Sequence, residues 1–269
     1  MLKLIAGATI SLATAVAAAQ TVTVTLDSPQ DGQTIAAGST IDWSISFAVS
    51  AADNQGLALL STDLVQDPAN PALFDLPPAD GVPSDMTNFS RPAGVSNPGE
   101  TDPTTGYIGV QRGTAGQKNL IQIGGGQHTF GVPRSPGSGV AENANVIAGV
   151  GQSGAVVLAS GSFTAPSECG TYAFRLENTV ANVVVQRNDP PAFSPVASAT
   201  VVVSDGTITI SVGVVGDIDG NGVVDLGDLA IMLSQFGMSG KLSADLNGNG
   251  VVDLGDLAIL LSAWGTSCG

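Results

Sequence analysis

Oxygen-bearing side chains recur at alternate positions in two short stretches near the carboxyl end of this chain. In the first stretch Asp217, Asp219 and Asn221 alternate, and Gly222 follows. Calcium takes about six to eight oxygen ligands from a chain that wraps around it, and a glycine at position six permits the sharp turn of such a loop. The spacing therefore predicts a calcium loop of about 12 residues that begins at Asp217.

The rest of each loop supplies the remaining expected ligands. In the first loop these are the backbone carbonyl of Val223 at position seven, Asp225 at position nine, directly or through a water, and Asp228 at position twelve. The second loop is expected to use Asp245, Asn247, Asn249, Val251, Asp253 and Asp256 in the same roles. Two Ca²⁺ ions are thus predicted. Position twelve is Asp rather than the usual Glu, so this shorter carboxylate must draw its helix closer to the ion or bind it through one oxygen.

The two stretches are copies of each other. Asp217–Gly237 and Asp245–Gly265 align with a constant offset of 28 residues, and 16 of the 21 aligned positions are identical. The alternative is a polar turn that merely precedes a helix. Such a turn has no need of side-chain oxygens at every alternate position in two copies, so the duplication favours metal binding.

An apolar helical pattern follows each loop. Leucines and one aromatic residue recur at steps of three and four, at Leu226, Leu229, Leu233 and Phe236 and again at Leu254, Leu257, Leu261 and Trp264. Gly237 and Gly265 stand where these helices should end. No helical pattern precedes either loop, so each unit is predicted to be a loop with one exiting helix.

A tandem pair of such half EF-hands resembles a type I dockerin domain, over about a fifth of the chain from Gly216 to Gly265. The resemblance implies two calcium ions, two antiparallel main helices related by pseudo-twofold symmetry, and docking onto a cohesin partner. In cellulosomal members, partner choice depends on loop positions ten and eleven and on basic residues later in the helix. Here those places hold Leu226–Gly227 and Leu254–Gly255, and then Leu233–Ser234 and Leu261–Ser262.

The calcium ligands therefore carry over from the resemblance, whereas the partner-recognition residues do not. The repeated pattern is more similar to the dockerin-type tails of secreted proteins from environmental bacteria such as planctomycetes. The expected partner is accordingly a cohesin-like protein or a cell-surface component.

The amino terminus predicts export. Lys3 is followed by an apolar stretch and by Ala17–Ala19, which is the pattern of a signal peptide cleaved after Ala19. A membrane anchor, the alternative, needs about 20 strongly apolar residues, and this segment is rich in Ala, Thr and Ser. No later stretch has the length and apolarity of a transmembrane segment. The mature protein is thus expected to be secreted, extracellular or at the cell surface.

The charge balance excludes one class of partner. The chain has 23 acidic and 8 basic residues, a formal net charge of −15, and nucleic-acid binding needs basic patches. The two cysteines, Cys169 and Cys268, allow one disulfide in an oxidising compartment, but their spacing leaves open whether they form it.

The region between the signal peptide and the duplication is predicted to be all-β. Val, Ile and Thr alternate with polar residues in short segments that Gly, Pro and Asn separate, at Thr21–Leu26, Ser39–Phe47, Gly154–Ala165, Gly170–Asn178, Ala181–Arg187, Ala197–Ser204 and Gly206–Val212. This pattern favours an antiparallel β-sandwich. The expected domains are a signal peptide over 1–19, a sandwich over 20–214 and the calcium module over 215–266. Within Gly154–Ser204, the phrase GSFTAPSECGTYAFRL loosely resembles the cohesin-like and carbohydrate-binding sandwiches that accompany dockerins. The expected sandwich is accordingly cohesin-like or jelly-roll-like.

Two segments within the sandwich region need separate interpretations. Asp67–Thr105 is crowded with Pro, Asp, Asn and Gly and reads as a long loop, which Phe74, Leu76, Met86 and Phe89 could hold in place. Gly149, Gly151 and Gly154 spell GxGxxG, but a strand pattern follows them rather than the helix that a dinucleotide site requires, so a turn is predicted.

The sequence offers few candidate catalytic residues. His128 is the single histidine and falls in a Gly-rich turn, so a surface role is expected. A carboxylate pair could hydrolyse a glycoside, but the sequence does not single one out among Asp42, Asp63, Glu142, Glu168 and Glu177. Trp43 alternates with core residues, which leaves Tyr107 and Tyr172 as weak candidates for stacking on a sugar.

The sequence as a whole predicts a secreted, non-catalytic calcium-binding protein that attaches to another protein through its tail. Three alternatives stay open: an extracellular polysaccharide-degrading glycoside hydrolase, a carbohydrate-binding protein, and a tail that packs on its own sandwich without any partner.

Overall fold

The structure is a computed structural model that describes residues 20–51, 53–78, 89–90, 109–127, 129, 146–189 and 192–267. The predicted signal peptide and its cleavage site lie outside the described residues, and so does most of the Asp67–Thr105 interval beyond residue 78.

One sheet of the described chain has four strands in the order β11, β1, β3 and β8. These are β11 (Thr200–Asp205), β1 (Thr21–Asp27), β3 (Thr40–Val49) and β8 (Val156–Thr164). Buried and more exposed residues alternate regularly along β1 and β3, because successive side chains of a strand point to opposite faces of the sheet. The Val, Ile and Thr alternation seen in the sequence therefore places one face of this sheet inward.

The second sheet is larger, and among the described residues its order is β2, β12, β9, β4, β7 and β5. The strands are β2 (Thr34–Ala36), β12 (Thr207–Gly213), β9 (Gly170–Val184), β4 (Leu57–Gln66), β7 (Asn119–Gln127) and β5 (Phe89–Ser90). Two short strands complete it: β10 (Val196–Ser198) pairs with β9, and β6 (Val110–Arg112) pairs with β7.

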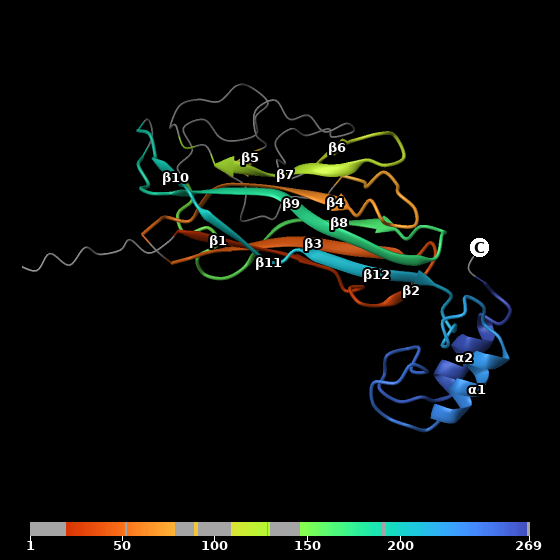
Figure 1. The fold of residues 1–269 in the computed structure, drawn as a ribbon. Helices are drawn as coiled ribbons and strands as arrows, with labels where there is room; N and C mark the ends of the chain where they lie inside the picture. The colour runs from red at the N-terminus through yellow and green to blue at the C-terminus, as the bar shows by residue number, and fades with distance from the viewer. Residues whose placement is uncertain are drawn as a thin grey trace, which may run out of the picture.

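The two sheets face each other, as Figure 1 shows, across one hydrophobic cluster. Ile45, Leu60 and Phe174 come from three different strands and are fully buried in it. The expectation for Trp43 is confirmed, since only 3% of this residue is exposed. Tyr172 is completely buried and its hydroxyl donates to the backbone carbonyl of Glu168 at 2.8 Å, so it offers no surface on which a sugar could stack.

The predicted sandwich needs three corrections. Two strand pairs are parallel, β1 with β11 and β12 with β2, so the fold is not purely antiparallel. The segments Gly170–Asn178 and Ala181–Arg187, predicted as two strands, are joined in the single strand β9, which ends at Val184. Strands β4 and β7 were not predicted, although β4 lies between β9 and β7 in the larger sheet.

The first part of the proline-rich interval is firmly attached to the sandwich. Phe74 exchanges two hydrogen bonds with Gln66, and its ring lies 5.5 Å from that of Phe163. Leu76 is buried in the core. The anchoring roles expected for Phe74 and Leu76 are confirmed, whereas Met86 lies outside the described residues.

Two helices form a separate unit beyond the end of the sandwich at which β12 and β2 finish, as Figure 1 shows. They are α1 (Leu226–Gln235) and α2 (Leu254–Ser262). Their shared core is distinct from that of the sandwich and includes Val224, Met232, Val252 and Leu260. Val214, which the predicted boundary assigned to the sandwich, packs against this second core. No helix in the described part of the chain has the length and apolarity needed to cross a bilayer.

Candidate metal centre

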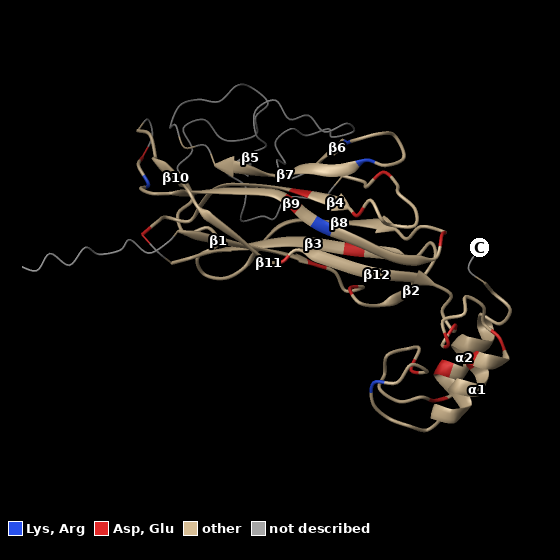
Figure 2. Ribbon diagram, viewed as in Figure 1, with Lys and Arg blue, Asp and Glu red and all other residues tan. Residues whose placement is uncertain are grey.

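The first predicted loop brings three carboxylates together. One carboxylate oxygen from each of Asp217, Asp219 and Asp228 lies within 4.8 Å of the others. Figure 2 shows acidic residues gathered around the helical unit and few basic ones beside them. Three like charges this close repel one another unless a cation lies among them, so the donor set fits the calcium ion that the spacing predicts.

Asp228 holds the loop to the start of its helix. Its Oδ1 accepts hydrogen bonds from the backbone N–H groups of Ile218 at 2.5 Å and Asp219 at 3.1 Å, and its Oδ2 accepts one from Asp225 at 2.8 Å. The residue is fully buried. Burial alone raises the pKa of this carboxyl, but the backbone N–H donors lower it more, and the net pKa is below its usual value. The buried group is therefore held as a carboxylate, the form that binds a cation.

The remaining side chains of the first loop organise its turn. The two oxygens of Asp217 accept hydrogen bonds from the N–H groups of Asn221 at 3.0 Å and Gly222 at 2.8 Å. Gly222 has a φ of +87°, which confirms the predicted turn at position six. The amide oxygen of Asn221 accepts from the N–H of Val223 at 2.9 Å.

Asp225 stands apart from the cluster of three. Its carboxylate caps α1 by accepting a hydrogen bond from the N–H of Gly227 at 2.7 Å, and it forms a reciprocal capping box with Asp228. Of the two roles expected for position nine, this arrangement favours the one through a water.

The second loop repeats this geometry residue by residue. Asp256 is fully buried and accepts from the N–H groups of Leu246, Asn247 and Asp253 at 2.8–3.0 Å. Burial raises the pKa of its carboxyl, and the same backbone donors lower the pKa to a net value below the usual one. Asp245 accepts from Asn249 and Gly250, and Asn249 accepts from Val251. The loops differ at position three, where Asp219 corresponds to Asn247, so the first loop has one more negative charge.

Gly227 and Gly255 have a role that the sequence interpretation missed. A Cβ atom on Gly227 would lie 2.7 Å from Oδ2 of Asp219, and one on Gly255 would lie 2.9 Å from Nδ2 of Asn247. A side chain at position eleven would therefore displace the side chain at position three. Their place in both copies, directly before the ligand at position twelve, was the signal available in the sequence.

The two repeats are interlocked by their backbones. Val223 in the first loop forms an antiparallel bridge with Ser267, which follows α2, and Val251 in the second loop forms one with Ser239, which follows α1. Around the first bridge, Val224 N–H donates to Thr266 at 3.0 Å and Gly265 N–H donates to Val224 at 2.9 Å. Each loop is thus closed by the segment that leaves the other repeat.

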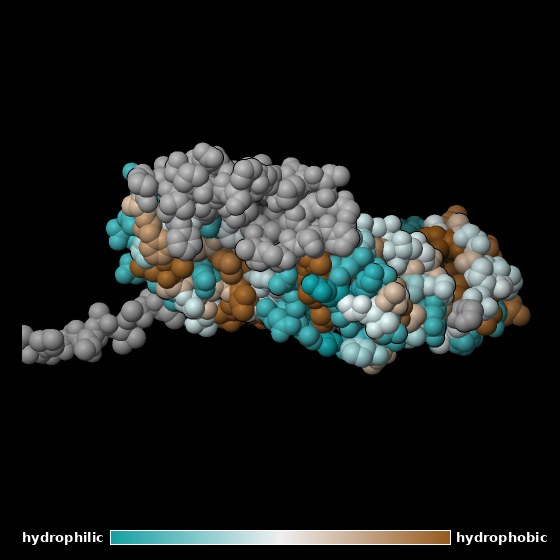
Figure 3. All heavy atoms as spheres, turned by 90° about the horizontal axis from the view of Figure 1, so that it is seen from above, coloured by the Kyte–Doolittle hydropathy of each residue, from teal (hydrophilic) through white to brown (hydrophobic). Residues whose placement is uncertain are grey.

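Each predicted apolar stripe contributes one residue to the core of this module, Leu229 in α1 and Leu257 in α2, while its other members are exposed. Leu226 and Leu254 are each 72% exposed, and Leu233, Phe236, Leu261 and Trp264 are also exposed. The fully buried helical positions are instead Asp228 and Met232 in α1 and Asp256 and Leu260 in α2. Figure 3 shows hydrophobic surface on the module, which lies at the right of that view. The stripe prediction was wrong for the exposed members because the inner face of each short helix holds the loop carboxylate at position twelve and the residue four positions after it.

The other candidate residues are dispersed over the described chain. Asp63 and Glu177 are cross-strand partners, but Asp63 accepts from Gln122 N–H and Asn178 Nδ2, and Glu177 pairs with Arg175 Nε at 2.7 Å. Glu168 lies in the turn before β9. Asp42 lines a hollow on the smaller sheet. His128, Glu142 and Tyr107 lie outside the described residues.

Two further expectations concern the glycine motif and the cysteines. Gly149, Gly151 and Gly154 have positive φ values and fall in turns before strand β8, which confirms the turn prediction over a dinucleotide site. Cys169 is disulfide-bonded. The second of the two cysteines in the sequence, Cys268, lies outside the described residues.

Comparisons with known proteins give limited matches. No family model and no curated protein matches the chain. One similar solved structure is described as "Type II cohesin-dockerin domain from Bacteroides cellolosolvens", with 36% identity over 21% of this chain and 92% of that one and a TM-score of 0.20. Another is the seventh ScaB type I cohesin from Pseudobacteroides cellulosolvens, with 14% identity over 71% of this chain and 92% of that one and a TM-score of 0.35.

The structural neighbours are thus cohesin and cohesin–dockerin domains. Because both TM-scores are below 0.5, neither likeness assigns a fold or a function to this chain. The functional interpretation rests on the loops and their surroundings.

A first prediction concerns Gly227. The Gly227→Ala substitution should stabilise the metal-free helix by about 0.5–1 kcal/mol, because Ala favours helix over Gly, yet weaken calcium binding at the first loop about 10-fold or more by displacing Asp219. Thermal unfolding in chelator and calorimetric titration with calcium measure the two effects. Gly255→Ala is the matched variant and should affect the second loop alone. Unchanged calcium affinity in both variants would contradict the role assigned to position eleven.

A second prediction concerns the interlocking of the repeats. A chain that ends at Gly265 should bind calcium about 10-fold more weakly at the first loop, because it loses the Thr266 carbonyl and the bridge to Ser267, at about 1 kcal/mol for a hydrogen bond. The second loop, which Ser239 closes, should keep more of its affinity. Titration in an Asp245→Ala background isolates the first loop, and full-length Cys169→Ser controls for loss of the disulfide. Equal weakening of both loops would count against the interlocked arrangement.

Proposed function

We propose that this chain is a secreted, non-catalytic protein whose C-terminal module binds two Ca²⁺ ions and attaches the protein to a partner. In this proposal the domains are a signal peptide over 1–19, a cohesin-like or jelly-roll-like β-sandwich over 20–214 and a dockerin-like module over 215–266. The observation that carries the proposal is the pair of matched loops, each with a buried aspartate that its own backbone holds ionised.

Calcium has a structural task in this module. Its ligands are Asp217, Asp219, Asn221, Val223, Asp225 and Asp228 in one loop, and Asp245, Asn247, Asn249, Val251, Asp253 and Asp256 in the other. The ions neutralise clustered carboxylates, order each loop and fix the direction of its helix. Metal binding then contributes directly to the free energy of folding.

The exposed helical side chains supply the attachment surface. The two repeats present the same leucines to solvent, Leu226, Leu233, Leu254 and Leu261, and each ends on an exposed aromatic residue, Phe236 or Trp264. Figure 1 shows the module beyond the end of the sandwich, and the module has its own core. Exposed apolar residues that recur on both helices favour protein association through this module over a tail folded onto its own sandwich.

The partner class follows from the resemblance of the repeats to dockerins: a cohesin-type domain or a cell-surface component. The leucines at positions where cellulosomal members carry polar and basic residues favour an apolar partner surface. The predicted export places the module where calcium is abundant enough to fill weak loops.

A third prediction tests the structural role of calcium. Removal of calcium from the mature full-length protein with EGTA should unfold the helical module and leave the sandwich folded, because the two cores are separate. Circular dichroism should lose its helical signal, and limited proteolysis should cut after residue 214. Addition of excess calcium should reverse both changes. A helical signal and protease resistance that persist in EGTA would refute the proposal.

A fourth prediction tests attachment. The mature protein, immobilised through the sandwich, should retain a partner from the culture supernatant of its own host in calcium and release it in EGTA. The double variant Leu233→Glu/Leu261→Glu should retain at least about 10-fold less of the same partner, since buried apolar anchors dominate interfaces. Val202→Glu places the same change on an exposed valine of the sandwich and is the matched control. Equal retention by both variants would show that the helical surface is not the docking site.

A further inference from the structure

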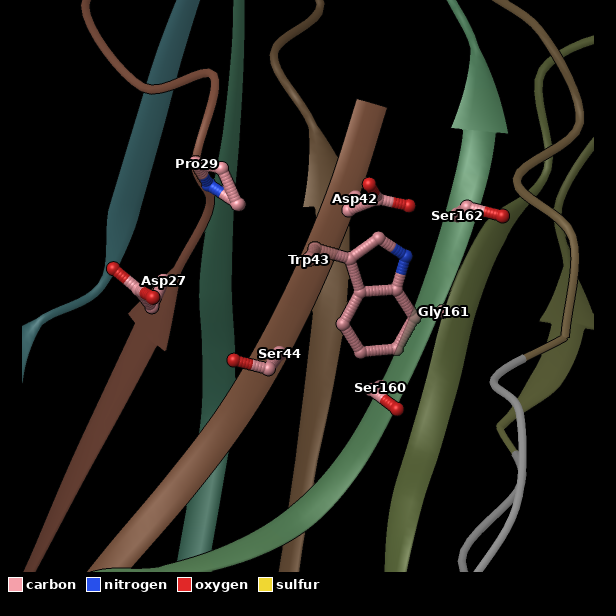
Figure 4. Close-up of a pocket in the computed structure, with 8 residues that line it drawn as sticks. All are labelled: Asp27, Pro29, Asp42, Trp43, Ser44, Ser160, Gly161 and Ser162. Carbon is pink, nitrogen blue, oxygen red and sulfur yellow. The ribbon is translucent and has the colours of Figure 1, made fainter. Parts of the chain in front are cut away.

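The smaller sheet carries a polar hollow on its outer face. The hollow has a volume of about 370 Å³, is open to solvent, and is lined by residues from β1, β3 and β8, including Asp27, Asp42, Ser44, Ser160 and Ser162. Figure 4 shows Asp42 and Ser44 on either side of Trp43, whose ring reaches toward Gly161 on β8. These polar side chains alternate with the buried residues of β3, so they face away from the core.

The strand register arranges these groups in rows. Ser44 lies opposite Asp27 on β1 and opposite Ser160 on β8. Asp42 lies opposite Ser162. Side chains of directly paired residues lie about 4.5–5.5 Å apart on one face, so two neighbouring rows present carboxylates and hydroxyls together.

The floor of the hollow depends on a glycine. A Cβ atom on Gly161 would lie 2.8 Å from the ring of Trp43. The absence of a side chain at this position lets the indole lie against β8. Trp43 belongs to the hydrophobic core. Its ring therefore forms the floor of the hollow and does not fill it.

A second hollow adjoins the first. It has a volume of about 360 Å³, is lined by residues that include Thr40, Phe74, Asp75, Pro77 and Thr164, and shares Ser162 with the first hollow. The ring of Phe74 is half-buried and fixed by contacts with Phe163 and Phe174. The combined groove thus has hydroxyls and carboxylates along one part and aromatic and proline surface along the other.

The hydrogen-bonding groups of the first hollow are free to bind a ligand. No described residue forms a hydrogen bond or ion pair with the side chains of Asp27, Asp42 or Ser162, and the same holds for Ser44 and Ser160. Carboxylates accept hydrogen bonds only, whereas serine hydroxyls both donate and accept. A ligand with many hydroxyl groups satisfies this set.

Three other ligand classes fit less well. Neither hollow is lined by Lys or Arg, so the only charged side chains that an anion would meet in their linings are carboxylates. A metal ion needs converging ligands, and within the described chain the one group of three or more acidic residues close enough to share an ion is in the first calcium loop. A peptide strand would pair with the free edge of β8, whereas the first hollow lies over the face that β1, β3 and β8 share.

We propose that the two hollows form a binding groove for a neutral polysaccharide. The carboxylates of Asp27 and Asp42 accept hydrogen bonds from sugar hydroxyls, Ser162 bridges the two hollows, and Phe74 and Pro77 contact the apolar face of a sugar ring. The groove lies on the sandwich and does not depend on calcium or on the attachment module.

Affinity gel electrophoresis of the mature full-length protein tests this proposal. The probes are three neutral polymers, a mixed-linkage β-glucan, an arabinoxylan and a galactomannan, with alginate as an anionic control. At least one neutral polymer should retard the protein, and the retardation should be the same in calcium and in EGTA. Alginate should have no effect. Retardation by none of the three neutral polymers, or by alginate alone, would overturn the proposal.

Matched variants locate the site. Asp42→Asn and Ser162→Ala should each weaken the retardation, Asp42→Asn by about 10-fold because it loses a hydrogen bond to a charged acceptor. Asp205→Asn makes the same charge change on β11, outside both hollows, and should bind like the original chain. Thermal unfolding confirms that the variants are folded. Binding that Asp42→Asn and Ser162→Ala leave unchanged, or that Asp205→Asn weakens equally, would also overturn the proposal.

Discussion

A buried aspartate at the start of each helix is the interaction on which the C-terminal module depends. Asp228 and Asp256 each accept three backbone N–H groups from the loop and the helix start, with no side chain of opposite charge among these donors. A charge without compensation is costly to bury, but charge-assisted hydrogen bonds from fixed donors offset much of that cost. The same contacts define the loop shape, so the site that would hold a cation and the junction that orients the helix are one structure.

The double role of the two buried aspartates explains why such a small module can leave so much apolar surface exposed. Among the described residues its core holds five fully buried apolar residues, and the buried aspartates occupy the inner face of each short helix. Leu226 and Leu254, two residues before them, are largely exposed, whereas Leu229 and Leu257, one residue after them, pack against the core. In the proposed attachment module, the aspartates that would hold the ions also determine which helix faces remain exposed for docking.

The sequence predicted the shape of the two loops better than the fold around them. Alternate oxygens and a glycine at position six depend on local chemistry, and the loops have the predicted shape. Strand β4 was missed because LALLSTDLVQ is rich in Leu and lacks the β-branched alternation of its neighbours. Bulges next to Leu57 and Asp63 also interrupt its pairing with β9. Its place in the larger sheet comes from tertiary packing, which overrides the weak local preference. The parallel pairing of β1 with β11 joins segments about 180 residues apart, and no local pattern encodes it.

The prediction of which helix face is buried was partly wrong for a different reason. A step of three and four residues identifies a helix and an apolar stripe, but it does not reveal which stripe is buried when a carboxylate competes for the interior. Met232 and Leu260 face inward because they stand four residues after Asp228 and Asp256, on the same face of each helix. Once position twelve of the loop is known to be buried, the inward face follows from helical geometry alone. The loop thus determines which face of the helix is buried. The hydrophobic pattern predicts that face correctly only when positions are counted from the aspartate at position twelve.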